Sequence, residues 1–177
     1  GASASGRSSK ENARWIVGVL IAVVGIFAAF AVVSYYFSWK NDYSIIHNIS
    51  SEVDNPRVDK SIENVCGYAG AWIGDVLVGQ GFGLFALIVP VLATLLGFYI
   101  ISRKPRLLHR WTLSSLLVLI LGSLSLSMGE IIFEAENLIF GGGLGGSLGR
   151  AVAMPFGTAV GNTGAVLILV VGWILTG

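Results

Sequence analysis

The sequence predicts an all-α membrane protein with four transmembrane helices. Of the 177 residues, 54% are hydrophobic and only 12% are charged, and the mean hydropathy is +0.79. This composition is too apolar and too poor in charge for a soluble domain. The apolar residues gather in four runs, each long enough as a helix to cross roughly 30 Å of hydrocarbon. We expect spans at about 15–37, 82–101, 111–128 and 160–176.

The charges predict that both termini lie in the cytoplasm. Basic residues precede the first run and fill the short turn between the second and third runs, whereas nine of the ten acidic residues lie in the two remaining connections. Short loops rich in Lys and Arg stay in the cytoplasm. The loops 38–81 and 129–159 are therefore expected on the periplasmic side. The residues that determine this topology are Arg14, Arg103, Lys104, Arg106 and Arg110.

The two ends of the sequence suggest a fragment of a longer chain. Residues 1–12 include GASASGRSS, which resembles a cloning or cleavage remnant, so we expect a disordered tail there. Residues 13–177 form the four-helix domain. The chain stops at Gly177, directly after the last apolar run and without a basic flank.

The first span begins at Arg14 and Trp15 and ends in the aromatic residues Tyr35, Tyr36, Phe37 and Trp39. Such amphipathic rings suit the headgroup level of the outer leaflet. The following loop is polar and contains Pro56. In the second span, Pro90 predicts a kink that neighbouring helices make tolerable.

Two glycine-rich strips occupy corresponding places before the second and fourth spans. Each strip repeats small residues at helical spacing, while bulkier residues cover the rest of its surface. We therefore expect two parallel pseudo-repeats, each with an interfacial helix whose small face packs inward. Glycine is also simply common in membrane proteins, and that explanation stays open. The expected helix-packing residues are Gly67, Gly70, Ala71, Gly74, Gly145, Gly146, Gly149 and Ala153.

The third span offers a small surface of its own. Gly122, Ser123, Ser125 and Ser127 permit a close approach by another helix.

The chemistry of the sequence predicts no catalytic, cofactor or metal site. Cys66 is a single thiol, which excludes chemistry that needs thiol pairs. His47 and His109 are expected on opposite sides of the membrane, each solvated or interfacial, so neither joins the other at a metal. No GxxxxGK[ST] phosphate loop is present. Asp75 and Arg150 are the charges inside the two strips, and either they pair or each faces water.

The order of these features resembles the N-terminal four-helix membrane domain of the FtsK and SpoIIIE family of bacterial DNA translocases. The resemblance covers nearly the whole chain and includes the segment N-x-C-G-x-x-G-A that begins at Asn64 and a later GGxLGxxL. Its residues are Gly67, Gly70, Ala71, Gly81, Gly83, Gly145, Gly146, Leu148, Gly149, Gly161 and Gly164.

The resemblance implies a noncatalytic anchor and oligomerisation module in the bacterial inner membrane at the division septum. Its implied partners are membrane lipid, further copies of itself in a ring, and other septal membrane proteins. DNA would be contacted only through a motor that this sequence lacks, and the whole translocase would couple chromosome segregation to cell division. The alternative is a stand-alone four-span transporter or channel subunit, which requires polar residues along a water-filled path.

The charge bias yields a direct test of topology. A cysteine introduced at Ser51 or Asn137 should react with a membrane-impermeant thiol reagent added outside intact cells, because both positions lie in acidic connections. A cysteine at Lys104 should stay unlabelled until the membrane is permeabilised. Labelling of the cysteine at position 104 in intact cells would show that the orientation is the reverse of the predicted one.

Overall fold

The computed structural model describes residues 2–47, 61–102, 108–135 and 139–176. All regular structure in these ranges is helical, which confirms the predicted class. The elements are α1 (Ala2–Ile46), α2 (Gly67–Gly74), the π-helical stretch η1 (Asp75–Phe82), the 3₁₀ stretch η2 (Gly83–Leu87), α3 (Ile88–Ser102), α4 (Leu108–Ile132) and α5 (Gly146–Thr176).

Four helical stretches are long and apolar enough to cross a membrane, as expected. They are Glu11–Ile46, Gly67–Ser102, Trp111–Ile132 and Gly146–Thr176. The second and fourth stretches are longer than the predicted spans because each glycine strip continues into the span that follows it, whereas the first and third are extended at their ends, to Ile46 and Ile132. The orientation of the bundle, the domain limits and the pseudo-repeat stay predictions.

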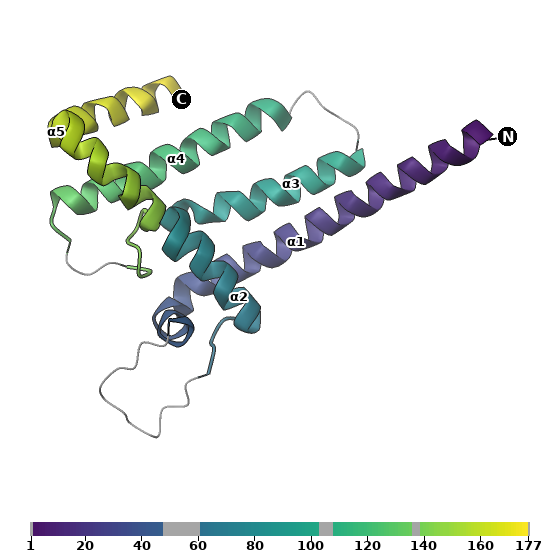
Figure 1. Ribbon diagram of the computed structural model, residues 1–177, viewed down its shortest axis with the longest axis horizontal. Coiled ribbons are helices and arrows are strands. Elements are labelled where there is room, and N and C mark those ends of the chain that lie inside the picture. Colours follow the sequence, from purple (N-terminus) through teal and green to yellow (C-terminus); the bar gives the residue numbers. More distant parts are fainter. Residues whose placement is uncertain (1, 48–60, 103–107, 136–138, 177) are drawn as a thin grey trace.

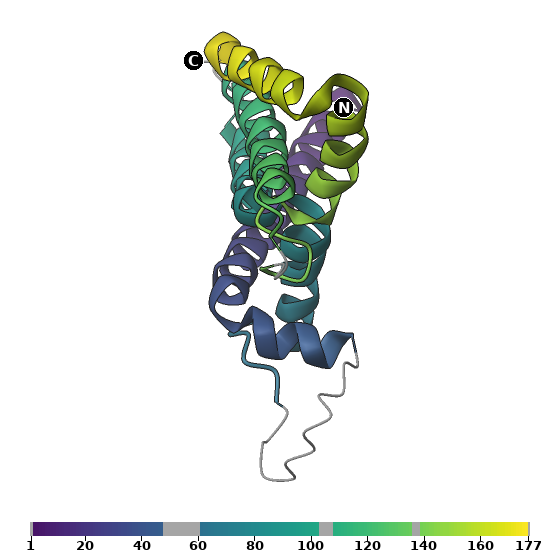
Figure 2. The same ribbon diagram turned by 90° about the vertical axis from the view of Figure 1, so that its left-hand side faces the viewer.

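Helix α1 is too long to lie entirely within a bilayer. Its 45 residues correspond to about 67 Å at 1.5 Å per residue, compared with roughly 30 Å of hydrocarbon. It begins at Ala2, so most of the tail expected to be disordered is helical here. The C-terminal part of α1 turns away and runs across the bundle instead of along it (Figures 1 and 2).

The helices α1 and α3 lie side by side in antiparallel directions (Figure 1). Glycines bring their backbones together. A Cβ atom on Gly97 would lie 2.5 Å from the backbone nitrogen of Ala22, and one on Gly25 would lie 2.6 Å from the backbone nitrogen of Thr94. Pro90 is buried in this pair. The close contact is typical of membrane helices, where small residues permit dispersion and backbone contacts.

Helix α5 packs on α4 and breaks at Gly161, whose φ of +75° and ψ of 156° are not helical. The two halves of α5 therefore point in different directions (Figures 1 and 2). The second half runs antiparallel to α4, where the Trp173 indole donates to the Ser125 hydroxyl over 3.1 Å. A small core forms between the two helices from Met128, Ala153, Ala165 and Leu169.

We name the two ends of the bundle by what they hold. The loop end contains the end of α1, residues 61–87, the end of α4 and residues 139–147, and the sequence predicts it outside the cytoplasm. Apolar side chains away from this end are widely exposed, for example Leu20, Val24 and Leu167. Exposed apolar surface of this kind suits contact with lipid.

Candidate functional site

The two glycine strips meet at the loop end, and there the backbones of the two halves of the chain touch. We call this contact the glycine junction, formed by residues 79–84 and 140–147. The backbone N–H of Leu84 donates to the carbonyl of Leu144 over 2.8 Å. Gly83 lies beside that carbonyl with φ of +60°, and a Cβ atom there would overlap the carbonyl oxygen of Leu144. Only glycine satisfies both conditions, so the junction depends on it.

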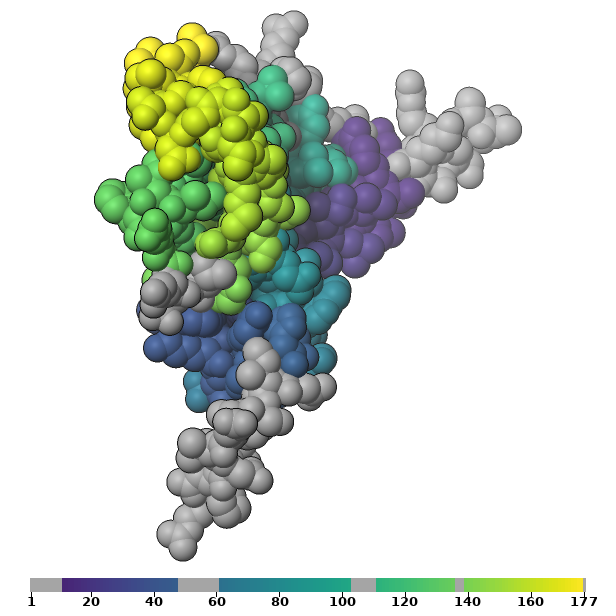
Figure 3. All heavy atoms as spheres, turned by 60° about the vertical axis from the view of Figure 1, so that its left-hand side comes forward, coloured from purple at the N-terminus to yellow at the C-terminus, as the bar shows by residue number. Residues whose placement is uncertain are grey.

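Two further contacts extend the junction. A Cβ atom on Gly142 would overlap the carbonyl of Gly79, and one on Gly146 would overlap the carbonyl of Gly81. The hydroxyl of Ser147 donates to the carbonyl of Gly79 over 3.1 Å. Figure 3 shows the yellow-green start of α5 directly against the teal segment that contains these residues.

Helix α4 supports the junction from its other side with the small surface predicted for the third span. The Ser123 hydroxyl donates to the carbonyl of Gly145 over 2.6 Å. Gly149, one helical turn further on, packs against the same helix, where its Cβ atom would lie 2.6 Å from the Ser127 hydroxyl.

Most of the residues expected to pack helices together are buried in the structure. Those that are buried are Gly70, Ala71, Gly74, Gly145, Gly146, Gly149 and Ala153, whereas Gly67 is exposed. At Gly67 a Cβ atom would have no neighbour within 4 Å, and the φ of +64° makes it the turn residue that begins α2. The effect of these residues on stability stays a prediction.

The aromatic residues at the end of the first span do not form the expected interfacial belt. Tyr35 is fully buried, and Tyr36 and Trp39 pack against Phe140 with ring centroids 5.5 and 5.7 Å apart. The Tyr36 hydroxyl donates to the carbonyl of Leu84 over 2.9 Å. Phe37 is the exception, with 86% of its surface exposed. The cluster therefore binds α1 to the glycine junction.

A buried carboxyl group lies directly beneath the junction. Asp75 is fully buried at the start of η1. Its Oδ1 accepts a hydrogen bond from the Tyr35 hydroxyl over 3.0 Å, and its Oδ2 accepts one from the Gln80 amide over 2.7 Å. The Nε2 atom of His47 lies 3.1 Å from the same Oδ2, and the His47 ring packs against Tyr43 at 4.3 Å. We call these residues the Asp75 cluster.

Two other buried carboxyl groups hold the connecting segments. Asp42 accepts from the Ser38 hydroxyl over 2.5 Å and from the backbone N–H of Glu63 over 2.9 Å. Glu130 accepts from the backbone N–H of Leu144 over 2.7 Å. Both carboxyl groups therefore tie a connection to the helix that precedes it.

The structure corrects one expectation about charged groups. Asp75 was expected to face water or to pair with Arg150, but its described partners are Tyr35, Gln80 and His47. The His47 side chain was expected to be solvated or interfacial, and it is 35% exposed. Its contact with Asp75 was not predicted, because the first span was expected to end at residue 37, which placed His47 in a loop.

The basic residues expected to determine topology are described only in part. Arg14 is exposed on α1, and the side chain of Arg110 as well as residues 103, 104 and 106 lie outside the described residues. Arg150 lies on α5, where its Nη1 atom is buried and has no hydrogen-bond partner. His109 also lies in the part of the chain whose side chains are not described.

The hydrogen bonds described above join the polar side chains of this region to one another and to the backbone, so the arrangement supports the structure. In the described ranges no group of three or more His, Cys, Asp or Glu residues is placed to hold a metal ion. Cys66 is a free thiol, half-buried, 3.9 Å from the carbonyl of Phe27. What the geometry accomplishes is a rigid connection between the α1 and α3 pair and the α4 and α5 pair.

Comparison with known proteins gives a family match over nearly the whole chain. A family model described as the 4TM region of DNA translocase FtsK/SpoIIIE matches residues 10–176. No match was found among curated proteins or among solved structures.

The contact between α5 and α4 yields a stability prediction with an internal control. Gly149→Leu should lower the free energy of unfolding by roughly 1 to 3 kcal/mol, because the added side chain meets Ser123 and Ser127. Gly129→Ala is the matched control on α4, since a Cβ atom there has no neighbour within 4 Å. Thermal unfolding in detergent measures both. Equal midpoints for Gly149→Leu and the wild type would contradict the packing.

The Asp75 cluster yields a second prediction. Asp75→Ala removes the acceptor of Tyr35 and Gln80, and leaving one buried donor unsatisfied costs about 1 to 3 kcal/mol. In a Tyr35→Phe background the same change should cost measurably less, with a coupling of about 0.5 to 3 kcal/mol. Denaturation of the four proteins of this cycle in detergent provides the values. Exposed Glu134→Gln serves as the control, and strict additivity would show that the hydrogen bond contributes nothing.

Proposed function

Because the chain belongs to the family of 4TM regions of FtsK/SpoIIIE DNA translocases, we propose that it anchors an ATP-driven DNA-translocating motor at the division septum. The family match over residues 10–176 is the observation that carries this proposal. The anchoring role itself follows from the family and from four helices able to cross a membrane. To this role we add three points: location in the inner membrane, location at the septum, and self-association.

The number of helices able to cross a membrane supports a role as a platform. Helix α3 runs antiparallel to α1, and the second half of α5 runs antiparallel to α4 (Figure 1), with Trp173 bonded to Ser125 in the second half of α4. If each of the four stretches crosses the membrane once, both chain ends lie on one side, and a motor attached beyond residue 177 lies on the side where α1 begins. The charge bias of the sequence predicts that this side is the cytoplasm, where DNA is found.

The glycine junction suits this role because it resists relative motion of the two helix pairs. Backbone contacts and hydrogen bonds join them at one end, with Leu84 bonded to Leu144 and Ser147 to Gly79. A pulling motor exerts load on its anchor. An anchor whose helix pairs are joined by close contacts transmits that load to the membrane instead of unfolding at once.

Tethering also explains how weak contacts suffice for assembly. Several anchored copies in one membrane patch have a high effective concentration, so that modest affinity between motors closes a ring. Under this proposal the anchor performs no reaction. Its histidine at position 47 and its buried carboxyl groups are engaged in structural hydrogen bonds.

The alternative of a four-span transporter or channel subunit is less well supported. A polar path requires polar groups at successive depths, and intramembrane ionisable residues usually mark such a path. The buried carboxyl groups that the structure describes are Asp42, Asp75 and Glu130, and all three lie at the loop end. Toward the other end, the described contacts between α1 and α3 are made by apolar and small residues.

Localisation in dividing cells tests the proposal. A fluorescent protein fused after Gly177 should concentrate at midcell, because the anchor carries the septal information. The control is the same fluorescent protein on an unrelated four-span membrane protein, which reports the even membrane signal. A uniform signal from the fusion would remove the septal role and leave a general membrane anchor.

A further inference from the structure

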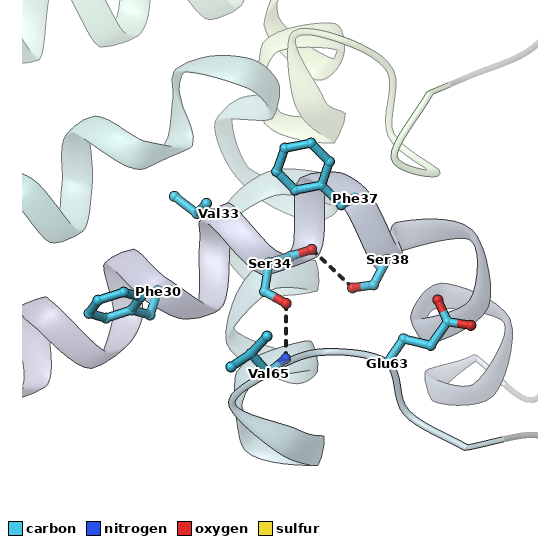
Figure 4. Close-up of a pocket in the computed structure, with 7 residues that line it drawn as sticks. All are labelled: Phe30, Val33, Ser34, Phe37, Ser38, Glu63 and Val65. Atoms are coloured by element: carbon cyan, nitrogen blue, oxygen red, sulfur yellow. Dashed lines mark hydrogen bonds between the residues drawn. The ribbon is translucent and has the colours of Figure 1, made fainter.

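A groove runs along the outer face of α1 and ends in polar groups. Its outer part has a volume of about 420 Å³ and lies between α1 and the segment before α2. Figure 4 shows the order of its side chains along α1: Phe30 comes first, then Val33 and Ser34, then Phe37 and Ser38, with Glu63 at the far end.

The groove continues between α1 and α3 as an almost wholly apolar cleft. This inner part has a volume of about 350 Å³ and shares Phe30 and Val33 with the outer part. Its remaining lining is Ile26, Ala29, Val91, Thr94, Leu95 and Phe98. The two parts therefore adjoin each other at Phe30 and Val33 along the same length of α1.

The length of the groove matches one leaflet of a bilayer. From Ile26 to Ser38 the helix advances 12 residues, or about 18 Å at 1.5 Å per residue. Half of the hydrocarbon core measures about 15 Å. The groove therefore begins near the bilayer centre and ends at the headgroup level, as a single acyl chain does.

The polar end carries the carboxylate of Glu63, whose backbone is held by a hydrogen bond to α1. Glu63 is the charged residue of the groove lining. Its backbone N–H donates to Asp42, and two residues later the N–H of Val65 donates to the Ser34 hydroxyl over 2.9 Å. The nearby cation Lys40 lies over the Trp39 ring, 5.8 Å from its centre, and is not part of the lining. A ligand at this end meets a carboxylate.

We propose that this groove binds a phospholipid with a primary amine headgroup, such as phosphatidylethanolamine. One acyl chain lies along Phe98, Phe30 and Val33, and the ammonium group donates a charge-assisted hydrogen bond to Glu63. A helix of a partner is the other candidate occupant. With side chains a helix measures about 10 to 12 Å across, which is wide for clefts of about 420 and 350 Å³.

Native mass spectrometry of the purified chain tests this binding. The probes are phosphatidylethanolamine, phosphatidylcholine and phosphatidylglycerol with identical palmitoyl and oleoyl chains. We expect phosphatidylethanolamine to be retained most and phosphatidylglycerol least. The quaternary ammonium of phosphatidylcholine cannot donate a hydrogen bond, and phosphatidylglycerol is an anion. Glu63→Gln should reduce the excess of the amine lipid over phosphatidylcholine about two- to five-fold, as expected for an exposed ion pair. Glu134→Gln, an exposed carboxylate just after α4 and outside the groove lining, should leave the excess unchanged.

A second variant tests the apolar part. Val33→Trp should lower the number of retained lipids of every headgroup, because the side chain is 41% exposed and a larger one extends into the groove. Val171→Trp on α5, where the side chain is 53% exposed, is the matched control and should retain them.

Two results would overturn the proposal. One is an unchanged lipid preference in Glu63→Gln. The other is unchanged lipid retention in Val33→Trp together with a smaller dimer population, which would assign the groove to a second copy of the chain.

Discussion

The close approach of two backbones at the glycine junction is the constraint on which the fold depends. The carbonyl of Leu144 accepts from Leu84 while Gly83 lies against it, and no side chain fits between them. In a bilayer, helices gain nothing from hiding apolar surface from lipid, so association relies on dispersion and hydrogen bonds at short range. The glycines permit this close approach because they have no side chain. The break in the helix at Gly81 and Gly83 exposes backbone groups that the second half of the chain then satisfies.

The buried carboxyl groups solve a related problem at the same end of the bundle. An isolated carboxyl group in apolar surroundings is costly unless it accepts hydrogen bonds. Asp42 and Glu130 each accept a hydrogen bond from a backbone N–H of a connecting segment. Asp75 accepts a hydrogen bond from the Tyr35 hydroxyl on α1. Each polar group thus fixes a segment that the apolar helices alone do not position. Together with the packing of Phe140 on Tyr36 and Trp39, they determine how the connections fold back.

The sequence predicted the fold class and the family, because both depend on properties that hold along the chain: apolar run length and the order of glycines. The small faces of the two strips were also predicted, because their small residues recur at helical spacing. What it did not predict is that the strips contact each other through Gly79, Gly142 and Gly146, since spacing within a helix says nothing of which helix lies opposite. The Asp75 cluster was missed for another reason. Ser38 and Asp42, one helical turn apart, indicate that α1 continues past residue 37, but polar composition suggested a loop.

Helix α5 differs from the other spans in how it can respond to its membrane. The end of α1 is held by Asp42, Tyr36 and the Asp75 cluster, so hydrophobic mismatch cannot be relieved by sliding or tilting that helix alone. At Gly161 the backbone is not helical, and a Cβ atom there would have no neighbour within 4 Å. Bending at Gly161 would therefore meet no side chain at the break itself. It could relieve hydrophobic mismatch only as far as the contacts of Ala165, Leu169 and Trp173 with α4 allow.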